Sequence, residues 1–315
     1  MIPTSQSKLT FQTGLWLSRA EVAVSDIGTT VRRPDGCTIG YAEFGTPSGT
    51  PIVSMHGYAD SRITRHPDDA LAARLNIRLI TLDRPGIGLS DYRPARTVLE
   101  WADDMATLAD HLALSKFAVF GWSGGGPHAL ACAYQFPERL TAVGVVAGFA
   151  PFDRPRATEG MRDDMRKFLP LLRRFPWLSQ LVSLSLPRAY RKDPAAAFEK
   201  QFGNGLPDPD RRALEEPLIR ANLLAGAVEA VRQGSRGLAT DMQLFLARPW
   251  GFRPEEIRVP VHLWYGDADT LVPLQMGQYL AKAIPGSRLT VYPAEGHMIF
   301  YRHWREILDT LAAAR

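Results

Sequence analysis

The sequence is poor in cysteine and has neither a long apolar run nor a strong excess of one charge. Its two cysteines, Cys37 and Cys132, lie far apart in unlike contexts, which fits a reducing compartment better than a disulfide scaffold. No run approaches the roughly 18 apolar residues of a membrane-spanning helix, and residues 1–25 do not follow the pattern of a signal peptide. We therefore expect a cytoplasmic protein without a membrane span.

The charged residues of the chain show no strong bias to one sign. The net charge is +4 over 315 residues, and no lysine-rich block resembles a nucleic-acid footprint, so we expect no DNA or RNA partner. No Cys/His cluster has metal-ligand spacing, and we expect no metal. Scattered apolar residues in residues 1–25 could dock on the body or on a partner subunit, or belong to a loosely ordered extension. Both alternatives, and with them a homo-oligomer, remain open.

A glycine-rich turn stands between an apolar run and an alanine-rich run, as Gly121-Trp122-Ser123-Gly124-Gly125. Read as strand, turn and helix, it leaves room for a sharp bend that exposes the Ser123 hydroxyl at the sheet edge. The backbone N–H of Gly124 would then point to where an oxyanion forms. Phosphate-binding turns are also glycine-rich, but this one lacks a Gly-Lys-Ser/Thr ending and the Gly-x-Gly-x-x-Gly spacing. The turn therefore favours a nucleophilic serine.

Candidate partners for that serine follow in the order acid, then histidine. Asp267 and Asp269 come after the apolar run 259–265, and His297 comes after the run 288–292. Two further motifs lie upstream. They are His56-Gly57-Tyr58 after residues 51–55, and Asp83-Arg84-Pro85-Gly86-Ile87-Gly88-Leu89-Ser90 after residues 77–82. With these motifs, the chain resembles the α/β-hydrolase superfamily from about Thr29 to Leu311.

The resemblance implies the α/β-hydrolase fold, a mostly parallel eight-stranded sheet with helices on both faces and an inserted helical cap. We expect residues 1–28 to be an N-terminal extension, residues 29–152 and 250–315 to be the core, and residues 153–249 to be the cap. The cap segment has 3.6-period stretches broken by prolines and no strand-like run. Helices are expected over residues 65–75, over residues 97–114 with Thr97 and Glu100 as a capping box, and over residues 299–314.

The resemblance also implies a catalytic triad. Ser123 is the nucleophile and His297 its base, and the Gly-x-x-Asp-x-x-Val-Pro register selects Asp269 as the acid. Asp267 is then a turn residue. Some relatives carry the acid after the sixth strand, which would make Asp153 the alternative.

The oxyanion hole is expected from the backbone N–H groups of Tyr58 and Gly124. His56 is interpreted as a structural loop histidine, and Asp83 and Arg84 as residues that fix their loop.

Substrate contacts are predicted for Trp122, which precedes the nucleophile, and for Met161, Met165 and Phe168 on an apolar stripe of residues 158–175. Most such stripes belong to the core, and that alternative remains open. The many arginines of this region are interpreted as solvated faces.

The expected activity is cleavage of an ester or related acyl bond of a small to medium, partly apolar molecule through an acyl-enzyme, without a cofactor. Amide, lactone and carbon–carbon bonds remain open. Alternatives are a cofactor-free lyase or perhydrolase on the same triad, or a ligand-binding or signalling module of the same fold.

Overall fold

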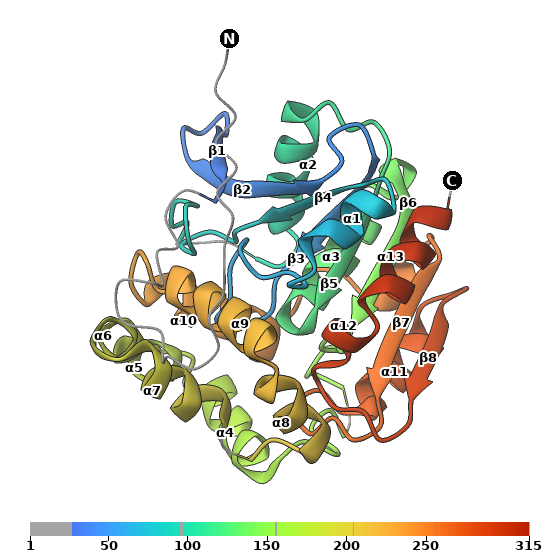
Figure 1. Cartoon of the computed structure of the whole chain (residues 1–315). Helices are drawn as coiled ribbons and strands as arrows, with labels where there is room; N and C mark the ends of the chain where they lie inside the picture. The colour runs from blue at the N-terminus through green and yellow to red at the C-terminus, as the bar shows by residue number, and fades with distance from the viewer. Residues whose placement is uncertain (1–26, 95–96, 155, 204, 315) are drawn as a thin grey trace.

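The computed structural model describes residues 27–94, 97–154, 156–203 and 205–314, so the expected extension 1–28 lies almost wholly outside the described residues (Figure 1). One sheet has the strand order β1-β2-β4-β3-β5-β6-β7-β8. β2 pairs antiparallel with β1 and β4, and the other pairs are parallel. The strands are β1 (Thr29–Arg32), β2 (Thr38–Gly45), β3 (Thr50–Met55), β4 (Ile77–Leu82), β5 (Phe117–Trp122), β6 (Leu140–Val146), β7 (Val261–Gly266) and β8 (Arg288–Tyr292). This confirms the predicted mostly parallel sheet of eight strands.

Helices cover both faces of the sheet because successive strand residues point to opposite sides. Val53 of β3 belongs to a core cluster with α2 (Trp101–His111), α3 (Gly126–Gln135) and α11 (Leu274–Ala283). Its neighbour Ile52 belongs to a second cluster with α1 (Asp69–Arg74) and α13 (Trp304–Ala313). The apolar run that forms β3 is therefore a strand buried on both faces.

The segment between β6 and β7 is helical in the residues that the structure describes. Figure 1 shows these helices gathered at one side of the sheet. Prolines stand in the first turn of several of them, where their missing N–H costs no hydrogen bond. The helices are α4 (Asp163–Arg174), α5 (Leu178–Leu184), α6 (Leu186–Lys192), α7 (Pro194–Phe198), α8 (Asp208–Glu215), α9 (Pro217–Ala230) and α10 (Arg236–Leu246). No helix among the described residues has the length and apolar content needed to cross a bilayer.

Three helices differ from their predicted bounds. The first begins at Asp69, because Pro67 disfavours helical backbone at the residue before it. Thr97 and Glu100 exchange the two hydrogen bonds of a capping box, although regular helix begins only at Trp101. The expected C-terminal helix is divided into α12 (Ile299–Arg302) and α13 at His303, whose ring stacks on that of Tyr292 in β8.

Candidate active site

The turn around Ser123 is as sharp as its glycines predict. A Cβ atom at Gly121 would lie 2.1 Å from the carbonyl oxygen of Gly125, and one at Gly125 would lie 2.1 Å from that of Met55. Ser123 itself has a φ of 54°, a left-handed conformation that is uncommon for a residue with a side chain. The backbone between β5 and α3 thus stores strain at the predicted nucleophile, as expected of a functional turn.

Loops after β7 and β8 bring an aspartate and a histidine into contact. His297 Nδ1 lies 2.7 Å from Asp269 Oδ2, with both side chains buried. The other oxygen of Asp269 accepts hydrogen bonds from the backbone N–H groups of Leu271 and Val272. Because the carboxylate is held at both oxygens, it fixes the imidazole in one orientation and leaves Nε2 available as a base.

The two aspartates that compete for this place in the sequence are separated clearly by the structure. Asp267 is exposed, and its Oδ1 accepts from the N–H of Ala294, 2.7 Å away, as a turn residue would. Asp153, the alternative after the sixth strand, is also exposed. The carboxylate that contacts His297 is that of Asp269.

The environment of His297 favours its charged form. Burial lowers the pKa of its imidazole, but the carboxylates of Asp269 and Asp210 outweigh burial, and the pKa lies above its ordinary value of 6.5. An imidazole with this environment is stabilised when it accepts a proton from a serine hydroxyl.

Asp210 is a residue that the sequence analysis missed. It lies on α8, and its carboxylate oxygens accept from the backbone N–H groups of His297 and Met298 at 2.9 and 2.8 Å. A Cβ atom at position 296 would lie 2.3 Å from Asp210 Oδ1, so a residue larger than glycine there would displace the Asp210 carboxylate. Nothing near Asp210 in the sequence marks it, because its partner lies 87 residues away.

The segment that follows β3 lies next to Ser123. A Cβ atom at Gly57 would lie 3.5 Å from that of Ser123, and one at Gly124 would lie 3.1 Å from the backbone nitrogen of Tyr58. The two amides predicted to form an oxyanion hole therefore belong to adjacent backbone segments beside Ser123. Their role in catalysis is a proposal that follows from this proximity.

Arg84 holds this segment in place. Its guanidinium donates to the carbonyl oxygens of His56 and Gly57 and forms a buried ion pair with Asp241 of α10, 2.8 Å away. His56 Nδ1 lies 2.9 Å from the carbonyl oxygen of Gly57 and its Nε2 accepts from the N–H of Arg84. Burial, followed by the charge of Arg84, moves the pKa of His56 well below 6.5. His56 is thus a neutral structural residue.

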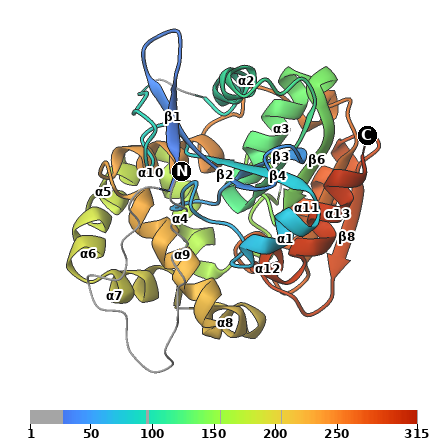
Figure 2. The same ribbon diagram turned by 45° about the horizontal axis from the view of Figure 1, so that its top comes forward.

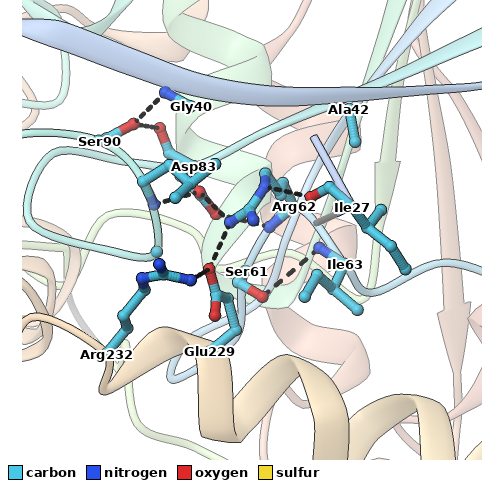
Figure 3. A network of polar contacts seen from close by, with 12 residues as sticks. Ile27, Gly40, Ala42, Ser61, Arg62, Ile63, Asp83, Ser90, Glu229 and Arg232 are labelled. Atoms are coloured by element: carbon cyan, nitrogen blue, oxygen red, sulfur yellow. Dashed lines mark hydrogen bonds and ion pairs between the residues drawn. The ribbon is translucent and has the colours of Figure 1, made fainter. Parts of the chain in front are cut away.

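A second buried ion network joins the same region to α9 (Figure 3). The Arg62 guanidinium donates to Asp83 at 2.7 Å and to Glu229 at 2.8 Å, and the Arg62 backbone N–H donates to Asp83. Burial raises the pKa of Asp83 to about 6, against the opposing charge of Arg62. Asp83 and Arg84 therefore fix loops. Asp83 is linked through Arg62 to Glu229 of α9, and Arg84 is paired with Asp241 of α10.

Ser123 and His297 line a cavity of about 440 Å³. Its walls are mainly apolar and come from the sheet loops and from the helices between β6 and β7. Three of the predicted contact residues, Trp122, Met165 and Phe168, are among the lining residues. The remaining aromatic and aliphatic lining residues are Tyr58, Ala59, Phe149, Val182, Phe198, Phe202, Leu206, Leu223, Met242, Phe245, Leu246, Leu271 and Met298.

Met161 is different from the other three predicted contact residues. It is buried in the core and does not line the cavity. The physical reason is the helix start: α4 begins at Asp163, so Met161 lies before the helix and not on its apolar stripe. Trp122 has a second role, because its ring packs on the His297 ring with centroids 5.5 Å apart.

Asp60 is one of several polar residues in the mainly apolar cavity wall, and the sequence analysis did not single it out. Its Oδ1 accepts from the Ser61 N–H and the Thr64 hydroxyl, whereas its Oδ2 has no hydrogen-bond partner among the described residues. Burial raises the pKa of this carboxyl to about 7 against the effect of those hydrogen bonds.

Comparison with known proteins agrees with the fold. Residues 50–303 match the family model described as alpha/beta hydrolase fold. A putative 2-succinyl-6-hydroxy-2,4-cyclohexadiene-1-carboxylate synthase from Bacillus subtilis is 26% identical over 285 residues, covering 84% of this chain and 90% of that protein. A pimeloyl-[acyl-carrier protein] methyl ester esterase from Chromobacterium violaceum is 26% identical over 266 residues, covering 84% and 93%. The crystal structure of the esterase RhEst1 from Rhodococcus sp. superposes with a TM-score of 0.66 at 20% identity, covering 91% of this chain and 98% of that one.

Proposed function

The chain belongs to the α/β-hydrolase family and is a hydrolase, and from this premise we propose that it cleaves an ester or related acyl bond through an acyl-enzyme on Ser123. The observation that carries the proposal is the contact between His297 and Asp269 at the wall of the cavity that Ser123 also lines. A serine hydroxyl is a weak nucleophile at neutral pH, and it needs such an oriented base.

In the proposed reaction, His297 removes the Ser123 proton as the serine oxygen attacks the acyl carbon. The tetrahedral oxyanion is stabilised by the N–H groups of Tyr58 and Gly124, each worth on the order of 3 kcal/mol of barrier. His297 then gives its proton to the leaving alcohol. Water activated by His297 attacks the acyl-enzyme and restores the serine. Asp269 stabilises the charged imidazole through both halves of the cycle.

The cavity supports a small to medium, partly apolar substrate. A volume of about 440 Å³ with mainly apolar walls suits an acyl or alcohol group of moderate size. We propose residues 29–152 and 250–315 as the catalytic core and residues 153–249 as the cap that shapes specificity. Met165 and Phe168 on α4 bring the cap into the cavity wall.

A second candidate is a lyase that uses the same triad without net hydrolysis. The similarity to a protein named as a synthase favours it over the signalling alternative. The two candidates differ in products, since the lyase forms no carboxylic acid from a simple ester.

The test is hydrolysis of a p-nitrophenyl ester series from acetate to decanoate, with Ser123→Ala as the control. Hydrolysis by the unmodified protein with a chain-length optimum, lost in Ser123→Ala, supports the acyl-enzyme route. Labelling of Ser123 by a fluorophosphonate, detected by mass spectrometry, gives an independent measure of its nucleophilicity. Absence of both hydrolysis and labelling would overturn the proposal.

A further inference from the structure

The cap helices farthest from the sheet carry an unusual combination of charge and exposed apolar surface. Residues 165–192 contain seven arginines and lysines and no aspartate or glutamate. The same segment holds six of the ten large apolar side chains that are exposed in the described part of the chain. In Figures 1 and 2, α5 and α6 lie at the outer edge of the molecule.

The apolar side chains form a continuous stripe. Leu171 lies in the last turn of α4, and Phe175 directly follows that helix. Trp177 precedes α5 with helical backbone, and Leu181 and Leu184 follow at intervals of four and three, so these three share one helix face. The rings of Phe175 and Trp177 join the first two residues to the other three, with centroids 6.4 Å apart. Trp177, Leu181 and Leu184 are each more than half exposed, which is uncommon for such residues in a group.

Basic side chains flank the stripe. Lys167 stands one helical turn before Leu171, and the guanidinium of Arg174 lies 5.2 Å from the centre of the Phe175 ring. At the other end, Ser185 keeps a helical backbone between α5 and α6, which places Arg188 about one turn beyond Leu184. We define the cap face as the five stripe residues together with these three basic residues.

We propose that the cap face is a docking surface for an anionic lipid membrane. Apolar side chains flanked by lysine and arginine are what an interfacial helix uses, because the apolar groups enter the headgroup boundary and the cations pair with lipid phosphates. A second copy of the chain suits the surface less well, since a two-fold contact would place like charges together.

Docking would place the cavity close to the membrane. Val182 lies on α5 between Leu181 and Leu184 and lines the cavity with Ser123. An apolar molecule that leaves the bilayer beside α5 would therefore meet the cavity wall after a short path. The docking surface itself does not depend on the proposed chemistry, because binding is measurable without turnover.

The experiment is sedimentation of the Ser123→Ala protein with vesicles of phosphatidylcholine alone or mixed with phosphatidylglycerol at about three to one. We expect at least tenfold tighter binding to the anionic vesicles at low salt, weakened strongly by added salt. The double variant Trp177→Ser/Leu181→Ser should lose at least tenfold in that affinity. Leu218→Ser, on α9, is the control and should leave the affinity unchanged. Leu218 is 54% exposed, close to the 56% of Leu181, but it lies outside the cap face.

Trp177 offers a direct readout of contact with lipid. Its emission should shift to shorter wavelength on anionic vesicles, and the shift should vanish in Trp177→Phe. No binding to either vesicle, or equal binding to both, would overturn the proposal. Concentration-dependent dimers abolished by the double variant, without vesicle binding, would assign the cap face to a second copy instead. Binding to polyglutamate but not to vesicles would assign it to an acidic protein, and would equally overturn the proposal.

Discussion

Replacing Asp60 by asparagine should change how the stability of the protein depends on pH. The asparagine keeps an acceptor for the Ser61 N–H and the Thr64 hydroxyl, and it removes the titrating proton. Burial raises the pKa of the Asp60 carboxyl from 3.8 to about 7 in the folded protein. Between those two values the folded state holds more protons than the unfolded state, so stability falls as the pH rises.

The magnitude follows from the two pKa values. Each pKa unit is worth about 1.4 kcal/mol, so the rise to about 7 makes ionised Asp60 cost about 4 kcal/mol of stability at high pH. About 2.5 kcal/mol of this loss falls between pH 5 and pH 8, which is accessible to measurement. The side-chain amide of the Asp60→Asn variant also brings a buried NH₂ group, whose cost does not vary with pH.

The assay is urea unfolding of the unmodified protein and of Asp60→Asn at pH 5, 6, 7 and 8. The difference in the free energy of unfolding should move by about 2.5 kcal/mol in favour of the variant across this range. Asp83 and Asp210 titrate in both proteins and largely cancel in the difference, because the charge of Asp83 is the smallest of the causes that shift the pKa of Asp60. Asp103→Asn, at an exposed position of α2, is the control for the same substitution away from the cavity. A flat curve for Asp60→Asn, within about 0.5 kcal/mol, would refute the reasoning.

The remaining predictions concern the reaction. Asp269→Asn should lower kcat on p-nitrophenyl esters by about 10³-fold or more, and Asp267→Asn should leave it nearly unchanged; the reverse would move the acid to Asp267. The kcat/KM profile should rise with pH through a pKa above 6.5, because the raised pKa of His297 keeps it protonated below; a limb under pH 6 would contradict this. Asp210→Ala should lower kcat more than it changes KM, with partial rescue by Asp210→Asn, and equal activity would deny the positioning role. Phe168→Ala should shift the preferred acyl length, and uniform losses with a lower Tm would return Phe168 to the core.

The fold was predictable because its signals are local. Three motifs each lie within about ten residues of the apolar run before them: His56-Gly57, the turn at Ser123, and His297. The strained conformation at Ser123 follows from its flanking glycines. The register after β7 was sufficient to separate Asp269 from Asp267. Where a short motif contained the whole constraint, the sequence specified the geometry.

The residues that the sequence analysis misplaced or missed depend on helix boundaries and burial, which no short motif contains. Met161 fits the helical spacing of residues 158–175, but the helix begins two residues later and leaves Met161 in the core. Asp60 looks like one more loop aspartate until its burial is known.

The sequence by itself thus determined the family fold, the candidate nucleophile and the candidate acid and base. Only the tertiary structure placed Asp210 against the backbone of His297, paired Arg84 with Asp241, and left Trp177 and Leu181 facing solvent. Contacts of this kind join segments that are tens to more than a hundred residues apart, and side-chain exposure depends on every element packed nearby. Both properties arise when separate elements come together, so no local pattern in the chain encodes them.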